Sequence, residues 1–299
     1  MLGALTGALL TGLAQGAMIA LVALGYTMVY GVLKLINFAH SEVFMMGAYG
    51  GFFFMSWLGG SEHPVVAAVF GTLGAMAAAA ALGIGVERIA YRPLRERAAL
   101  RGPAGKGSNA RITPLVTALG VSVLLQNVAQ LLFSARYRSY PQLFSHTRLL
   151  IAVVALAVMA ALQLLVYRTW VGKAMRALSA NPEAARLMGI RTGRVIAFTF
   201  VVGSALAALG AVLYCLDQSQ VYPTMGVVIG TRAFVAAVLG GIGSIPGAVL
   251  GGGLIGIIGE LVKLSSYSGG ADVLVFLVLI LVLLLRPSGL LGKAGIEKV

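Results

Sequence analysis

The sequence predicts an all-α fold, a polytopic transmembrane helical bundle with about eight or nine membrane segments. Hydrophobic residues make up 59% of the 299 residues and charged residues only 10%, whereas soluble domains average about 25% charged. Charge-free runs long enough to cross a bilayer recur along the chain. The net charge of +13 is concentrated between these runs, as expected of cytoplasmic loops. These three observations exclude a soluble globule and a disordered chain, and they favour a single transmembrane domain over residues 1–299.

The first two thirds of the chain contain six expected segments. Residues 1–33 precede Lys34 without a charge and form a run too long for a signal-peptide core, so we expect an uncleaved first span. The next five segments are likewise apolar and bounded by charges or turn residues. They are expected at residues 36–59, 64–86, 112–135, 149–167 and 195–216.

The last third is expected to contain a broken helix pair and a final span. Glycines and a proline between residues 240 and 247 weaken helix continuity, which predicts segments near 225–243 and 246–262. The final run, residues 273–285, is short, but Arg286 could snorkel and extend it. As an alternative, the segment at residues 36–59 or the pair at residues 225–262 could be re-entrant. The number of full membrane spans would then be lower.

Basic residues set the expected orientation. Loops 87–111 and 168–194 carry most of them, and both fall on the side of the C-terminal tail if all nine segments cross. This side should be cytoplasmic, with the N-terminus outside and the C-terminus inside. Loop 134–148, with three arginines, conflicts with this topology because it falls outside. The basic residues of the cytoplasmic loops account for the positive net charge of the chain, so no nucleic-acid partner is expected.

Motifs for catalysis or nucleotide binding are absent from the sequence. None of the three Gly-Lys pairs is followed by Ser or Thr, as a phosphate-binding loop requires. There is also no Gly-x-Ser-x-Gly elbow and no His/Cys metal cluster. We therefore expect no catalytic residue, no bound metal, no cofactor and no enzymatic activity in this chain.

One short helix is predicted inside the second basic loop. Asn181 can cap its first turn, Pro182 suits the first helical position, and Glu183 complements the helix dipole. Two alanines follow, and Gly189 can supply a left-handed stop. A helix of about two turns is marginal alone in water. It either rests on its own domain or inserts into a cytosolic partner.

Polar residues and helix breakers within the expected spans are candidates for a translocation pathway or gate, because polar groups at membrane depth are costly. Alternative roles are anchoring, inter-helix hydrogen bonding, an ion pair between Arg232 and Glu260, and tight packing of small residues. The candidates are Asn37, His40, Glu42, Gln126, Asn127, Arg232, Gly240, Gly241, Gly243, Pro246 and Glu260.

The pattern Glu183-Ala184-Ala185-x3-Gly189 resembles the EAA loop of binding-protein-dependent ABC permeases, whose short helix docks on the ATPase. The match is partial, because Thr199 stands where that family has Ile in the downstream motif. The resemblance implies that Arg92, Arg95 and Arg97 could also face the ATPase. The ATPase-coupling residues that it implies are Pro182, Glu183, Ala184, Ala185, Leu187, Met188 and Gly189.

Longer stretches resemble the branched-chain amino-acid ABC permeases, and most closely the subunit of the high-affinity leucine, isoleucine and valine importers that ends in Glu-Lys-Val. They are residues 26–31 (YTMVYG), 36–43 (INFAHSEV), 87–94 (ERIAYRPL), 125–127 (LQN), 233–248 (AFVAAVLGGIGSIPGA), 286–289 (RPSG) and 297–299 (EKV). The resemblance implies a bacterial inner-membrane importer containing a second, paralogous permease, two cytosolic ATPases that use ATP, and a periplasmic solute-binding protein.

The sequence leaves several alternatives open for the cargo and for the class of transporter. The cargo could be another aliphatic amino acid, an amide or urea, and the chain could instead be a stand-alone secondary transporter or channel. A membrane enzyme is a further alternative, which the missing catalytic motifs disfavour. The residues alone do not locate the gate or distinguish homodimeric from heterodimeric pairing.

Overall fold

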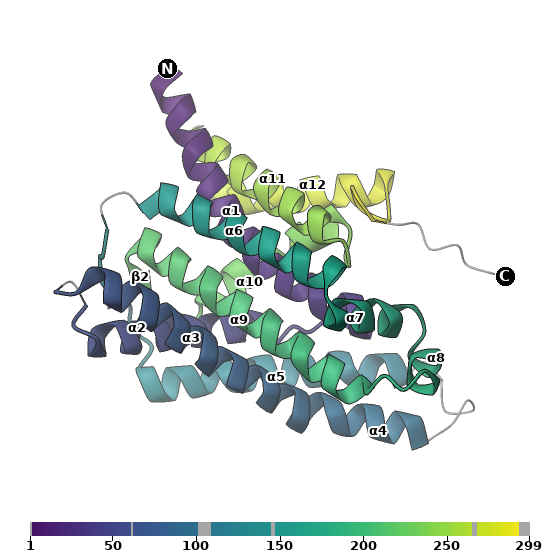
Figure 1. Ribbon diagram of the computed structural model, residues 1–299. Helices are drawn as coiled ribbons and strands as arrows, with labels where there is room; N and C mark the ends of the chain where they lie inside the picture. Colours follow the sequence, from purple (N-terminus) through teal and green to yellow (C-terminus); the bar gives the residue numbers. More distant parts are fainter. Residues whose placement is uncertain (1, 61, 101–108, 145–146, 265–267, 293–299) are drawn as a thin grey trace.

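The computed structural model describes residues 2–60, 62–100, 109–144, 147–264 and 268–292, and these form a helical bundle, which confirms the all-α class (Figure 1). Each expected segment is helical. The helices are α1 Leu2–Leu33, α2 His40–Trp57, α3 Pro64–Val86, α5 Asn109–Phe133, α6 Thr147–Arg168, α9 Thr192–Gln218, α10 Met225–Gly240, α11 Ile245–Lys263 and α12 Ala271–Leu285. By length and apolarity, six of the described helices could cross a membrane: α1, α3, α5, α6, α9 and α11.

The bundle has two distinct ends (Figure 1). At one end lie α4 (Arg92–Leu100), α7 (Trp170–Ala180) and α8 (Pro182–Leu187), so both basic loops share this end. At the other end, β1 (Arg138–Ser139) and β2 (Gln220–Val221) form a short antiparallel pair. The shared end agrees with the charge pattern, which predicts that both loops lie on one side.

The first basic loop begins with more helix than the sequence predicts. Helix α3 continues through the π-helix η1 (Glu87–Tyr91) into α4, so the described residues after 86 are helical up to residue 100. The prediction of a loop starting at residue 87 is therefore wrong. Glu87 explains the continuation, because it is buried and forms an ion pair with Arg95 two turns further on.

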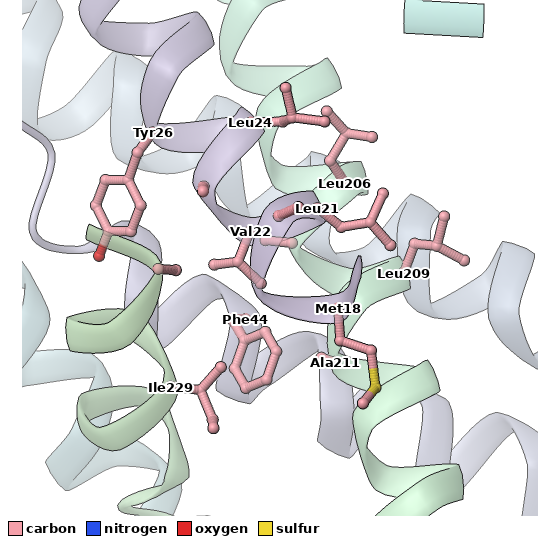
Figure 2. Close-up of a cluster of buried hydrophobic side chains, with 14 of the residues drawn as sticks. Met18, Leu21, Val22, Leu24, Tyr26, Phe44, Leu206, Leu209, Ala211 and Ile229 are labelled. Atoms are coloured by element: carbon pink, nitrogen blue, oxygen red, sulfur yellow. The ribbon is translucent and has the colours of Figure 1, made fainter. Parts of the chain in front are cut away.

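The core of the bundle surrounds α1 and α9. These are the most enclosed of the long apolar helices, and α5 is the least enclosed. Figure 2 shows Leu21 and Leu24 of α1 packing near Leu206 of α9, with Phe44 of α2 and Ile229 of α10 on the other side of α1. A helix that is apolar on every face must be surrounded by protein or lipid. Helix α1 satisfies this condition with protein from Met18 to Val29.

Small residues let α11 approach two helices at once. A Cβ placed on Gly252 or Gly256 would meet the backbone of α1, whereas one on Gly247 or Gly251 would meet the backbone of α10. The small-xxx-small spacing therefore serves tight packing on two faces of α11, one of the roles expected from the sequence.

We predict that Gly256→Ala destabilises the bundle by about 1–3 kcal/mol, because the added methyl group would overlap the backbone at Gly12 and Gly16. Gly259→Ala is the matched control on the same helix, since a Cβ there meets nothing within 4 Å. Thermal unfolding of the purified protein in detergent checks the prediction. Equal melting temperatures for the two variants would contradict the close packing of α1 on α11.

Two arginines of loop 134–148 find local partners, although this loop conflicts with the charge-based topology. The Arg138 guanidinium donates to the Phe133 carbonyl at 2.9 Å and lies 5.9 Å from the Phe52 ring centroid. Arg148 Nε lies 3.7 Å from Asp217 Oδ1. Asp217 thus offsets the charge of Arg148, which lowers the net charge of the loop at the end opposite α8.

Candidate functional site

The predicted helix in the second basic loop is present as α8. The Asn181 side-chain oxygen accepts hydrogen bonds from the backbone amides of Glu183 and Ala184, both at 3.0 Å. Pro182 occupies the first helical position, and Gly189 has a φ of +82°, the left-handed geometry expected of a stop. We name residues 182–189 the coupling segment.

The coupling segment presents an apolar tip to its surroundings. Ala185 is 4% exposed and anchors α8, whereas Leu187 is 89% and Met188 82% exposed. Helix α8 lies at an end of the bundle, together with α4 and α7 (Figure 1). Leu187 and Met188 are adjacent on a helix that is marginal alone, so the tip is a candidate surface for contact with another protein.

Hydrogen bonds tie the coupling segment to α9. The Ile190 amide donates to the Ala185 carbonyl at 3.0 Å, and Arg186 Nε donates to Thr192 Oγ1 at 3.3 Å. Thr192 is the first residue of α9, which runs through the core. A displacement of α8 would therefore move the end of a central helix.

Helices α2 and α10 both begin inside the bundle. After α1 ends, the chain reverses at Lys34, whose φ is +55°, and α2 starts where the His40 ring packs 4.7 Å from the Tyr26 ring of α1. In the first turns of α10, Gly226 and Gly230 lie directly against Ser41 of α2. Two helix N-termini thus meet in the protein interior, which is the arrangement of discontinuous helices at transporter binding sites.

Three predicted pathway residues occur at this junction but face different neighbours. The Asn37 side-chain oxygen accepts from Tyr91 Oη at 2.8 Å and from the Ala39 amide at 3.1 Å. His40 packs on α1 at Tyr26. Ser122 Oγ of α5 lies 3.4 Å from Glu42 Oε1. All three predicted residues are 4% exposed or less, so they lie in the interior.

Glu42 and His40 each keep one buried polar atom, Oε2 and Nε2, without a hydrogen-bond partner among the described residues, and Glu42 is the acidic one of the two. Its residue is fully buried, and Oε2 has no hydrogen-bond partner among the described residues. Oε2 lies against Gly226 in the first turn of α10, where the partial positive charge of the helix N-terminus favours an anion. Its role in transport stays a prediction.

We predict that Tyr91→Phe lowers the free energy of unfolding by about 1 kcal/mol, because it removes the buried hydrogen bond to Asn37. Tyr49→Phe is the control, since the buried Tyr49 hydroxyl has no partner in the described part of the chain. Denaturant titration of both variants measures the difference. An equal loss in both would contradict a specific Tyr91–Asn37 contact.

The ion pair between Arg232 and Glu260, one of the alternatives from the sequence, does not form. Arg232 instead pairs with Asp272 at the start of α12, with both Nε and Nη2 2.7 Å from Oδ1. Glu260 pairs with Lys263 one turn along α11. Sequence reasoning missed Asp272, although it is an acidic residue just before the final apolar run. Arg232 and Glu260 thus each pair with a nearer residue of opposite charge than the partner that their positions in the apolar segments suggest.

The predicted break between α10 and α11 is confirmed. Gly241 and Gly243 have φ values of +99° and +96°, and Pro246 lies in the first turn of α11. The backbone at Gly240 is covered by the chain after α12, since the Leu291 amide donates to its carbonyl at 2.9 Å. The break is therefore packed against the protein's own C-terminal segment.

The remaining candidates lie at the periphery. Asn127 is exposed, and its amide nitrogen donates to the Val123 carbonyl of its own helix at 2.8 Å; Gln126 is half-buried. Arg92 is exposed and pairs with Glu96, and Arg95 pairs with Glu87. The side chain of Arg97 lies outside the described residues. No described group of three His, Cys, Asp or Glu side chains could hold a metal ion.

A multi-pass helical bundle in which two helices begin in the interior is typical of membrane transport proteins. Comparison with known proteins narrows this class. The chain belongs to the family described as "Branched-chain amino acid transport system / permease component", whose profile matches residues 8–284. No solved structure matches.

Two relatives are similar over nearly their whole length. The high-affinity branched-chain amino acid transport system permease protein BraD of Pseudomonas aeruginosa is 40% identical over 97% of both chains. The permease protein LivH of Escherichia coli K12, named for the same kind of system, is 39% identical over 96% of both chains. These relatives are transporter permease subunits and not enzymes.

Proposed function

We propose that this chain is a permease subunit of an ATP-binding-cassette importer that moves branched-chain amino acids across the bacterial inner membrane. The observation that carries the proposal is the identity of about 40% across almost the entire chain to permeases named for this transport. The coupling segment supports it as well, because its exposed Leu187 and Met188 offer a surface on which a cytosolic ATPase can dock.

The proposed assembly contains a second permease, two cytosolic ATPases and a periplasmic solute-binding protein. The end with α4, α7 and α8 faces the cytoplasm, because it collects the basic loops. The end with β1 and β2 then faces the periplasm and receives cargo. The N-terminus lies outside and the C-terminus inside.

The proposed mechanism couples ATPase closure to movement at the junction of α2 and α10. Closure would displace the coupling segment, and the hydrogen bonds from Ile190 and Arg186 would pass the displacement to α9. Gly47 of α2 lies directly against Ala208 of α9, so a shift of α9 changes the packing of α2. The junction near Glu42 would open and close in response.

Transport by the reconstituted assembly tests the proposal. The chain is purified with the permease, ATPase and binding-protein products of its neighbouring genes and placed in proteoliposomes. We expect uptake of radiolabelled leucine that requires ATP and the binding protein, and that excess isoleucine or valine inhibits. Uptake without ATP would favour a secondary transporter or channel, and selective uptake of urea or amides would overturn the proposed cargo.

The proposed orientation gives a labelling prediction. A cysteine at residue 62 should react with an impermeant maleimide added to the periplasmic side, and one at residue 100 should react only from the cytoplasmic side. The native Cys215 is buried, so it should contribute little background. The reverse pattern would overturn the topology.

A further inference from the structure

A large basic cavity adjoins the coupling segment. Its volume is about 960 Å³, and its walls come from η1 and α4 on one side and from the α8–α9 connection and the start of α9 on the other. We name it the basic cleft. It is lined by six arginines, Arg88, Arg92, Arg95, Arg186, Arg191 and Arg194.

The charges of the basic cleft are not balanced within the chain. Its two acidic residues are already engaged, Glu87 with Arg95 and Glu96 with Arg92. Arg88, Arg191 and Arg194 have no acidic partner in the described ranges. The cleft therefore carries a net positive charge that only a group from outside the described residues can offset.

The general preference for basic residues in cytoplasmic loops does not by itself explain why these arginines share one cavity. That preference places Arg88 and Arg191 on the same side of the membrane, but it does not bring two segments far apart in the chain to one cavity. Like charges that converge repel each other, so the arrangement favours an anionic occupant. Guanidinium groups pair well with carboxylates, which they can bind through two hydrogen bonds.

We propose that the basic cleft is a second docking site for the ATPase and receives acidic side chains from the subunit that covers α8. This inference rests on the proposed function. Arg186 and Gly189 belong both to the coupling segment and to the cleft wall, so a subunit seated on Leu187 and Met188 reaches the cleft without a gap. Continuity with the apolar tip and charge complementarity both support this occupant.

Occupation of the cleft would link the ATPase to α2 by a second route. Carboxylates between the walls would hold η1 and the start of α9 at a fixed separation. Tyr91 of η1 donates to Asn37, which in turn accepts from the Ala39 amide at the start of α2. The η1 wall of the cleft would therefore connect the docking surface to the α2–α10 junction by a path that does not pass through α8.

Binding of the ATPase to the permease pair in nanodiscs tests the inference. The triple variant Arg88→Gln, Arg191→Gln, Arg194→Gln removes the unpaired cleft charges. The control Lys34→Gln, Arg168→Gln, Arg286→Gln removes three exposed charges outside the cleft lining. In nanodiscs of phosphatidylcholine alone, we expect the triple variant to bind the ATPase about tenfold more weakly than wild type, with a smaller salt dependence. The control should stay within about twofold of wild type.

Other outcomes would overturn the inference. Wild-type affinity and salt dependence in the triple variant would show that no acidic ATPase surface enters the cleft. A difference that appears only when anionic phosphatidylglycerol is added would assign the cleft to lipid headgroups. If wild type binds the ATPase and Leu187→Ser, Met188→Ser weakens binding while the triple variant does not, the proposed function stands and this inference fails. If wild type does not bind the ATPase, the proposed function itself fails.

Discussion

Replacing Leu187 and Met188 together with serine is expected to reduce ATP-driven leucine uptake at least about tenfold, while the bundle stays folded. Both side chains are more than 80% exposed, so their removal costs the isolated chain little packing. If the assembly buries them, each Leu or Met side chain contributes about 1.5–3 kcal/mol to the interface. Uptake into proteoliposomes and the thermal stability of the permease are measured in parallel.

A matched control separates the coupling segment from its surroundings. Trp170→Ser removes an apolar side chain that is 83% exposed on α7, at the same end of the bundle but outside the coupling segment. We expect this variant to keep most of its uptake. Normal transport by the Leu187/Met188 variant, or equal losses in both variants, would contradict a specific role for the tip of α8.

Removing Arg95 is expected to destabilise the bundle by about 3 kcal/mol, because Glu87 would remain buried without its partner. The Glu87 side chain is 3% exposed and that of Arg95 is 24% exposed, whereas both members of the Arg92–Glu96 pair are about 60% exposed. Arg95→Met should therefore lower the free energy of unfolding far more than Arg92→Met, for which we expect less than about 1 kcal/mol.

The double variant Glu87→Gln, Arg95→Met tests the cause of this loss. If the penalty comes from an unpaired buried carboxylate, the double variant should recover most of the stability lost in Arg95→Met. Denaturant unfolding of all four proteins gives the coupling free energy. Additive effects of the two substitutions would show that Glu87 and Arg95 do not act as a pair.

The sequence predicts the parts of the fold that depend on local chemistry. Long apolar runs predict the helices, glycines and Pro246 predict the break before α11, and Asn181 with Gly189 predicts both ends of α8. Each of these features follows from backbone preferences within a few residues. They are therefore recognisable without knowing which helices are neighbours.

Features that depend on distant neighbours were not predictable in the same way. Arg232 finds Asp272 forty residues further along the chain, and this pairing depends on how α10 packs beside α12. The continuation of α3 into α4 depends on a π-helix that buries Glu87 against Arg95. The interior start of α2 depends on the reversal at Lys34 and on the contact between His40 and Tyr26. Single-sequence patterns carry little information about such contacts.

In the candidate site, too, local features are predicted from the sequence and contacts between distant residues are not. The two ends of α8 are predicted residue by residue, because capping is a local property, whereas its docking role stays a prediction. The basic cleft combines two loops that the sequence shows only as separate groups of charges. The pathway candidates Asn37, His40 and Glu42 are recognised as unusual, but their three different partners, Tyr91, Tyr26 and Ser122, appear only in the folded chain.

Cysteine cross-linking at the tip of α8 tests whether the ATPase docks on this helix. Met188→Cys, in a Cys215→Ala background, is combined with single cysteines introduced across the ATPase surface in the complete assembly. We predict rapid disulfide formation at one patch of the ATPase, with a yield that changes when ATP binds, and protection of the introduced thiol from maleimide. A thiol at this position that reacts freely with maleimide and forms no cross-link in an assembly that transports leucine would contradict the account.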